Sequence, residues 1–109
     1  MTDKIVVLCT CESEEQAGSI ARSLVEQNLA ACVNILPNIR SIYRWKGTIE
    51  DAAEYLLVIK SRRDKFDALR EAIVKIHSYD LPEVIAVPIV DGAQAYLRWI
   101  DQSLDREPN

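Results

Sequence analysis

The middle of the chain contains two long stretches of strand-forming residues joined by a turn. Residues 29–60 read LAACVNILPNIRSIYRWKGTIEDAAEYLLVIK. Leu29–Leu36 is largely apolar and stops at Pro37, and Ile39–Trp45 then mixes aromatic and β-branched residues, which are enriched in strands. Lys46-Gly47 follows as a turn signal. We therefore predict one long strand, bent near Pro37, that leads into a β-hairpin.

The return arm of this hairpin follows the turn. Thr48–Glu50 and Tyr55–Lys60 have the composition of a strand. Between them, Asp51–Glu54 is rich in acidic residues and favours a β-bulge or a local widening of the hairpin. The two arms are therefore predicted to pair as antiparallel neighbours, with an irregularity in the second arm.

Helix and strand signals lie on both sides of the hairpin. Ser13 opens a capping box, and apolar residues then recur at helical spacing until Asn28, which offers a left-handed stop. Ser61 is expected to cap a second helix, which His77 closes. The remaining predicted elements are a strand over Ile5–Cys9, a strand over Val84–Val90, a final helix whose Tyr96 and Trp99 are expected in the core, and a frayed tail over Asp105–Asn109.

The predicted order of elements is β-α-β-β-α-β with an extra C-terminal helix. This is the split βαβ arrangement of ferredoxin-like folds, an α+β class in which both main helices lie on one face of an antiparallel sheet. At 109 residues the chain has room for one domain, which we place over residues 1–109.

The predicted strands are apolar at odd and even positions alike, as in Ile5–Cys9, Tyr55–Ile59 and Val84–Val87. Strands of this kind are buried on both faces of their sheet. Two helices can cover one face, but one short third helix cannot cover all of the other. We therefore predict that neighbouring subunits complete the burial.

Composition and charge exclude several classes of function. The formal net charge is −4 at pH 7, and an acidic chain lacks the basic surface that nucleic acids demand. The longest apolar runs are far shorter than the ~20 residues of a membrane helix or the core of a signal peptide. Three cysteines are an odd number, which favours reduced thiols and a cytoplasmic location. Neither nucleic acid nor a membrane is therefore expected as a partner.

Cys9 and Cys11 form a Cys-x-Cys pair at the end of the first predicted strand. Alternate residues of a strand point to the same face about 6.5 Å apart at the backbone, so both thiols can approach one soft ion. Thiolates favour Cu(I) and Zn(II), and imidazole suits both metals, so His77 is the third candidate ligand. The alternative is structural, because buried cysteines often only pack and a histidine at a helix C-terminus can interact with the helix dipole.

No catalytic set can be named from the sequence. Cys9 with His77 as a base and Glu54 or Asp80 as an orienting group would make a thiol enzyme, but the spacing specifies no such geometry. With three glycines the chain contains neither phosphate-binding loop pattern, so no organic cofactor is expected. The sequence therefore does not predict an enzyme.

Tyr43 and Trp45 stand near the tip of the predicted hairpin. Large aromatic residues in such a place usually mark contact surfaces. We therefore interpret them as interface residues. The alternative is that they pack back onto their own sheet or onto the C-terminal helix.

Several short motifs along the chain are specific when taken together. They are VLCT at residues 7–10, LAACVNI at 29–35, SIYRWKG at 41–47, EYLLVIK at 54–60, HSYDLPEV at 77–84 and YLRWI at 96–100. In this combination the chain resembles the CutA family, the divalent-cation tolerance proteins, over most of its length.

This resemblance implies a ferredoxin-like subunit in a tight homotrimer, similar in assembly to PII signalling proteins, with extended hairpins that pair between subunits. It also implies copper ligation, proposed in the family for a cysteine at the position matched by Cys9 and for histidines in the segment matched by Ile76-His77. Ile76 is a departure, because members with a His-His pair offer two imidazoles there. Cys11 is expected to compensate in part, and Cys32 is expected to be structural.

Three functional hypotheses follow from the residues and the resemblance together. In the first, a trimer binds copper or another soft cation through Cys9, with Cys11 and His77, and contributes to metal tolerance. In the second, a PII-like module binds a small ligand in clefts between subunits. The residues expected near that ligand are Tyr43, Trp45, Glu54, Lys60 and Tyr79. In the third, the trimer is a scaffold without a ligand.

Overall fold

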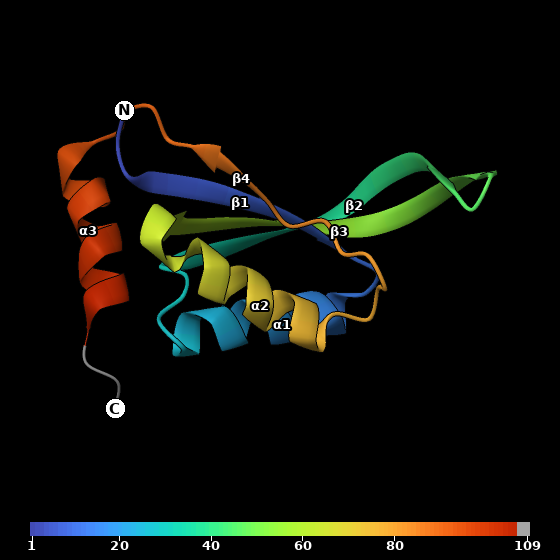
Figure 1. Ribbon diagram of the computed structural model, residues 1–109, viewed down its shortest axis with the longest axis horizontal. Coiled ribbons are helices and arrows are strands. Elements are labelled where there is room, and N and C mark those ends of the chain that lie inside the picture. The colour runs from blue at the N-terminus through green and yellow to red at the C-terminus, as the bar shows by residue number, and fades with distance from the viewer. Residues whose placement is uncertain (107–109) are drawn as a thin grey trace.

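Four strands, three α-helices and one short 3₁₀ helix make up residues 1–106, which are the residues that the computed structural model describes (Figure 1). The strands form one antiparallel sheet in the order β2-β3-β1-β4. The predicted α+β, ferredoxin-like fold with an extra C-terminal helix is therefore confirmed. In chain order the elements are β1 Lys4–Cys11, α1 Glu14–Glu26, β2 Cys32–Trp45, β3 Thr48–Arg62, η1 Arg63–Lys65, α2 Phe66–Ile76, β4 Ile85–Pro88 and α3 Gln94–Asp105.

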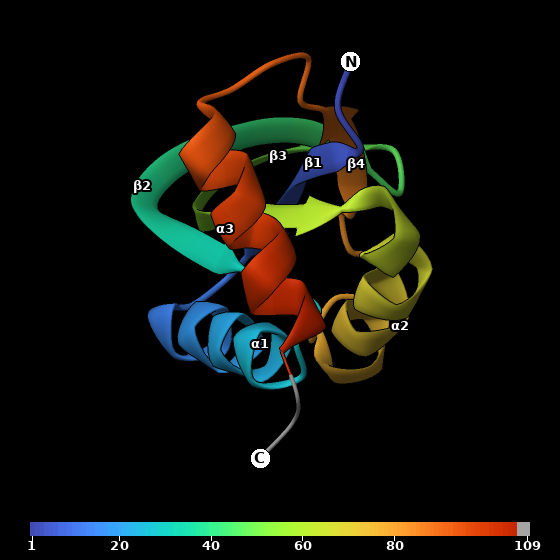
Figure 2. The ribbon, with the colours of Figure 1, turned by 90° about the vertical axis from the view of Figure 1, so that its left-hand side faces the viewer.

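Helices α1 and α2 cover one face of the sheet, and α3 lies at the end of the molecule opposite the hairpin tip (Figure 1 and Figure 2). Ser13 caps α1 as predicted, because its Oγ accepts a hydrogen bond from the Gln16 N–H at 3.1 Å. Burial of each large aliphatic side chain between the two layers contributes about 1.5–3 kcal/mol. Fully buried examples are Val7, Ile20, Leu57, Ile59, Leu69 and Ile73.

The hairpin of β2 and β3 extends beyond the body of the molecule (Figure 1). Its register shifts between Leu36 and Ile39 on β2, whereas β3 is unbroken, so the predicted bulge at Asp51–Glu54 is wrong. The irregularity lies in β2 because Pro37 has no N–H to donate and Asn38 adopts a left-handed φ of 61°. The bend predicted near Pro37 is therefore confirmed.

Strand β3 continues through Ser61, so the prediction that Ser61 caps the second helix is wrong. Ser61 is fully buried, and its Oγ donates a hydrogen bond at 2.7 Å to the carbonyl oxygen of Leu29. The chain instead enters α2 through η1, and neither N-cap has a side-chain hydrogen bond. His77 does close α2 as predicted, since it is the C-cap residue and turns the backbone to an extended conformation.

The last strand, β4, is shorter than predicted, because only Ile85–Pro88 pairs with β1. Pro88 ends this edge strand, where a missing N–H breaks no ladder bond in the sheet interior. The chain then turns to α3, which extends through Asp105. Of the predicted frayed tail, residues 107–109 lie outside the described residues.

An ion cluster joins the end of β3 to α3. The Arg62 guanidinium donates to Asp64 at 2.7 Å, to Asp101 at 2.9 Å and to Asp105 at 2.8 Å, and we call these four residues the Arg62 cluster. The hydrogen bonds from Arg62 hold the pKa of each of the three carboxyl groups below its usual range. The cluster therefore fixes one end of α3 electrostatically.

The apolar residues of α3 separate into two groups. Ile100 and Leu104 are buried against Ala31, as helical spacing predicts. Tyr96 and Trp99 are exposed in the subunit, so their predicted place in the core is wrong for a single chain. Helical spacing shows that they share a side of α3, but it does not show what covers that side.

The sheet face opposite α1 and α2 retains apolar side chains without a covering layer in this subunit. Val87 pairs with Val6 and Ile85 with Leu8, and residues opposite each other in this register lie on the same face. Ile85 and Val87 are exposed, as is Leu36 on the same face of β2. None of the helices within residues 1–106 is long and apolar enough to span a lipid bilayer.

Candidate metal centre and adjoining cavity

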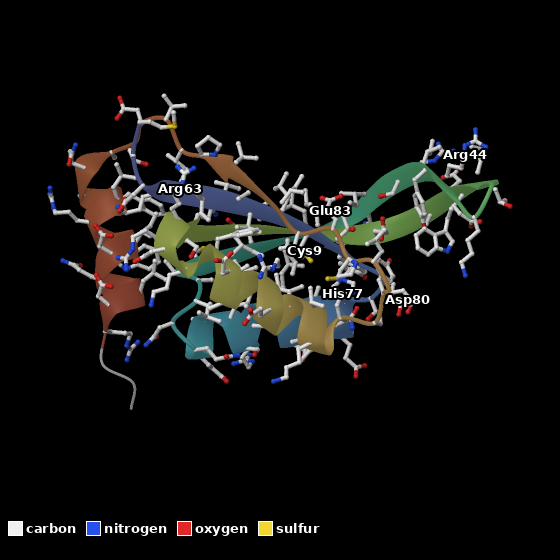
Figure 3. All side chains as sticks on the ribbon, in the orientation of Figure 1. Cys9, Arg44, Arg63, His77, Asp80 and Glu83 are labelled. Carbon is white, nitrogen blue, oxygen red and sulfur yellow. The ribbon has the colours of Figure 1, made fainter. Side chains whose placement is uncertain are left out.

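Two cysteines and one histidine converge at the end of β1. Cys9 and Cys11 are alternate residues on the sheet face that α1 and α2 cover, and both are fully buried. His77 is 9% exposed and stands where α2 ends. One ligand atom from each of the three residues lies within 4.8 Å of the others. Figure 3 shows Cys9 and His77 together near Glu83, where the hairpin leaves the body of the subunit.

Both ring nitrogens of His77 have backbone partners. Nε2 lies 2.8 Å from the carbonyl oxygen of Thr10, and Nδ1 accepts a hydrogen bond from the Tyr79 N–H at 3.0 Å. A carbonyl can only accept and an N–H can only donate, so these contacts assign the proton of the neutral ring to Nε2. A metal ion bound by His77 must therefore displace one backbone partner of the ring.

The two thiols perturb each other. The hydrogen bond to Cys11 is the largest cause that raises the pKa of Cys9, followed by burial and by the negative charges of Glu83 and Glu54. The same hydrogen bond lowers the pKa of Cys11, because it stabilises the Cys11 thiolate. The pair therefore loses its first proton at Cys11, and the nearby negative charge opposes loss of the second in the absence of a cation.

The donor set fits a soft metal ion. A tetrahedral zinc ion with Zn–S bonds of about 2.3 Å holds its sulfur ligands about 3.8 Å apart. The present separations of up to 4.8 Å therefore need to shrink by about 1 Å. Two thiolates and one imidazole are also soft or intermediate donors of the kind that Cu(I) and Zn(II) prefer. Cys32 is absent from this group and lies instead within 4.0 Å of Lys60 Nζ.

A cavity of about 700 Å³ adjoins these three residues on the other side of the sheet. Ile39 pairs with Glu54, and Thr10 pairs with Leu56, so alternate residues along β2, β3 and β1 share this face. The loop after α2 supplies the remaining lining residues. The lining residues are Thr10, Ser41, Ile42, Tyr43, Trp45, Glu54, Ser78, Tyr79, Asp80, Leu81 and Glu83.

Four of the five residues predicted near a small ligand line this one cavity, namely Tyr43, Trp45, Glu54 and Tyr79. Lys60 does not. It lies farther along β3, opposite Cys32, and its Nζ donates to Asn34 Oδ1. Lys60 and Glu54 were both predicted near a ligand in a cleft between subunits; within one chain, six residues of extended strand separate them by about 20 Å.

Tyr79 connects the cavity to the candidate metal centre. Its hydroxyl donates a hydrogen bond at 2.5 Å to Glu54 Oε2, and its ring lies against the His77 ring with centroids 4.7 Å apart. Burial, together with this bond to Glu54, raises the pKa of Tyr79. A shift of the His77 ring would therefore move Tyr79, which is hydrogen-bonded directly to Glu54.

Glu83 is the residue of this region that sequence reasoning missed. It lines the cavity and contributes to the pKa of Cys9. The segment after His77 contains two carboxylates, Asp80 and Glu83, in a loop that must pass the end of β1. That combination is the signal by which the residue could have been found, although the path of the loop is not encoded in any local pattern.

Comparisons with known proteins agree with this fold. Residues 5–103 match the family described as CutA1 divalent ion tolerance protein. The divalent-cation tolerance protein CutA of Thermus thermophilus is 46% identical over 90% of this chain and 95% of its own length. A CutA homolog of Xenopus laevis is 50% identical over 84% of this chain, which spans only 60% of that relative.

A solved structure extends the likeness to three dimensions. The crystal structure of CutA from Xylella fastidiosa has a TM-score of 0.93 and 39% identity, over 95% of this chain and all of the other. The family match covers nearly the whole described chain. The chain therefore belongs to the CutA1 divalent ion tolerance protein family.

Proposed function

We propose that this protein binds a soft metal ion, with copper as the first candidate, through Cys9, Cys11 and His77, and that it acts in the tolerance of divalent cations. The observation that carries the proposal is the convergence of two buried thiols and one imidazole within 4.8 Å. Membership of a family named for divalent ion tolerance supports the wider role.

The chemistry of the surroundings favours a cation over an empty pair of thiols. The hydrogen bond to Cys11 and burial raise the pKa of Cys9, the negative charges of Glu83 and Glu54 add to this, and a free thiolate is therefore disfavoured there. A bound cation reverses this effect, because it attracts both the thiolate and the carboxylates. Binding is expected to release protons from the thiols and hence to strengthen as the pH rises.

We further propose that the protein is a homotrimer in the cytoplasm and has no catalytic activity. The exposed apolar face of the sheet supports association, since contiguous exposed apolar surface usually marks an interface. Three free cysteines suit a reducing compartment. Light scattering should give about 37 kDa, three times the 12.3 kDa subunit. A mass equal to one subunit at micromolar concentration would contradict the trimer.

Competitive titration of the reduced protein tests the metal site. Cu(I) is added against a chelator of known affinity, and Zn(II) is titrated in parallel. We expect saturable binding that Cys9→Ala and Cys11→Ala each weaken by more than the 10–100-fold typical of losing an outer-shell partner. Cys32→Ala removes a thiol outside the group and should leave the affinity unchanged.

His77→Gln tests the contribution of the third candidate ligand separately from that of the two thiols. The glutamine side chain retains hydrogen-bonding capacity but lacks the imidazole, so the affinity should fall while the protein stays folded. An affinity for Cu(I) that is indifferent to both Cys9→Ala and Cys11→Ala would contradict the proposal. The tolerance phenotype would then be an indirect effect.

A further inference from the structure

The residues that line the cavity beside the candidate metal centre are not themselves ligands in the proposed metal binding. Its walls combine the carboxylates of Glu54, Asp80 and Glu83 with aromatic rings on the hairpin and the loop. No lysine, arginine or histidine is among the described residues that line it. A cavity with this charge repels anions and attracts cations.

Glu54 is the strongest evidence for a ligand. Its side chain belongs to a residue that is only 5% exposed, yet none of the ion pairs among the described residues includes it. Oε2 accepts the Tyr79 hydroxyl, and no described residue bonds to Oε1. Every fully buried polar side-chain atom in the described structure has a partner, so Oε1 is accessible to solvent, and Glu54 is one of the residues that line the cavity. A mostly buried carboxylate with one free oxygen calls for a donor with positive charge.

The aromatic residues define what kind of cation fits. Tyr43 and Trp45 are alternate residues of β2 and share a face of the hairpin, and Tyr79 contributes a third ring from the loop. Aromatic faces attract ammonium groups, and they also bury the methylene groups next to such cations. An organic cation therefore matches this wall better than a strongly hydrated metal ion.

The three carboxylates do not converge on one point. Among the described residues, the group close enough to hold one ion is Cys9, Cys11 and His77, and no set of acidic residues in the cavity meets the same condition. Figure 3 shows Asp80 and Glu83 apart from each other along the loop. Separate anionic points suit a ligand that carries more than one ammonium group along an apolar chain.

We propose that this cavity binds an aliphatic di- or polyammonium cation. One ammonium group donates to Glu54 Oε1, a second lies near Asp80 or Glu83, and the connecting methylenes lie against Tyr43 and Trp45. A volume of about 700 Å³ is within the range of pockets that bind small molecules. This site adjoins the candidate metal centre, but Cys9, Cys11 and His77 do not line it, and it does not require a metal ion.

Spermidine is a suitable probe, and Trp45 can report its binding. The chain has two tryptophans, and the other, Trp99, is exposed on α3, so Trp99→Phe leaves one indole beside the cavity. We expect saturable binding of spermidine that changes the fluorescence of Trp45 at constant ionic strength. Glu54→Gln, which keeps a hydrogen-bond acceptor, should weaken it about tenfold, as expected for loss of a charge-assisted bond.

Matched controls separate a site from general attraction to an acidic protein. Glu26→Gln removes the same charge from an exposed position on α1 and should leave the affinity unchanged. The double variant Asp80→Asn, Glu83→Gln alters only exposed loop carboxylates and should weaken binding without affecting folding. Cys9→Ala should have no effect, so this inference can fail or succeed independently of the metal site.

Three results would overturn the proposal. The first is the absence of saturable binding at millimolar spermidine. The second is equal weakening by Glu54→Gln and Glu26→Gln, which would show non-specific attraction. The third is a Trp45 fluorescence signal that does not respond to spermidine but changes with protein concentration, in step with the mass measured by light scattering. This result would show that a second copy of the chain fills the cavity.

Discussion

The hydrogen bond between Tyr79 and Glu54 should be one of the strongest single polar contacts of the subunit. Tyr79→Phe removes the hydroxyl and keeps the ring that lies against His77. Hydrogen bonds to charged groups contribute about 1.5–3 kcal/mol, and the loss leaves a mostly buried carboxylate without its partner. We therefore expect the free energy of unfolding to fall by about 2 kcal/mol.

Urea unfolding at a fixed protein concentration measures this loss, because association into the proposed trimer would make the apparent stability depend on concentration. For m near 2 kcal/mol/M, a loss of about 2 kcal/mol lowers the midpoint by about 1 M. In the Glu54→Gln background the bond is neutral, so Tyr79→Phe should cost only about 1 kcal/mol. Tyr43→Phe removes the hydroxyl of an exposed side chain that makes no hydrogen bond to the other described residues, so it should cost under about 0.5 kcal/mol. If Tyr79→Phe lowered the free energy of unfolding no more than Tyr43→Phe does, the strength assigned to the bond between Tyr79 and Glu54 would be refuted.

Three further changes test the fold. Arg62→Met should flatten the dependence of the free energy of unfolding on pH. In the wild type the lowered carboxyl pKa values of the Arg62 cluster stabilise the fold above the ordinary aspartate pKa, and this contribution is lost as the pH falls through the pKa values of the folded protein. Urea midpoints at pH 7 and pH 3 measure the difference. Leu57→Ala, at a fully buried core position, should lower the free energy of unfolding by about 2–5 kcal/mol in urea titrations, and a loss below 1 kcal/mol would contradict the assigned core. Ser61→Ala should lower the free energy of unfolding by about 1–3 kcal/mol in calorimetry, since it leaves the Leu29 carbonyl without its donor. A loss of helix content alone would instead support a role of Ser61 as a helix cap.

Features encoded in short stretches of sequence were predictable. Strand alternation alone places Cys9 and Cys11 on one face, and the capping pattern at Ser13 marks the start of α1. The bend near Pro37 follows from the missing N–H of proline. In each case the cause lies within a few residues of the effect, so the sequence is sufficient.

Features that depend on tertiary contacts were not predictable in this way. Serine at the start of a helical pattern favours a cap, but Ser61 is held in β3 by a bond to Leu29, which is distant in the sequence. The irregularity expected in the acidic stretch of β3 belongs to its partner β2. Tyr96 and Trp99 have the spacing of a buried stripe but lie on the exposed side of α3. Local propensity gives way to tertiary contacts at each of these positions.

The candidate site shows the same division. His77 was predictable as a residue at an element end, but its approach to the thiols depends on where α2 ends relative to β1. Lys60 and Glu54 were both expected near a ligand between subunits, although extended strand separates them within one chain. Glu83 reaches the cavity only because the loop after α2 crosses the end of β1. The sequence therefore indicates the ligand types, and the path of the chain decides which of them meet.

X-ray absorption spectroscopy at the copper edge tests the proposed metal centre most directly. The sample is reduced protein loaded with one Cu(I) per subunit, measured beside Cys9→Ala and Cys32→Ala. We expect two sulfur neighbours and one imidazole nitrogen around copper in the wild type and in Cys32→Ala, and a single sulfur in Cys9→Ala. A copper shell of nitrogen and oxygen alone, or a sulfur count that Cys9→Ala leaves unchanged, would contradict this expectation.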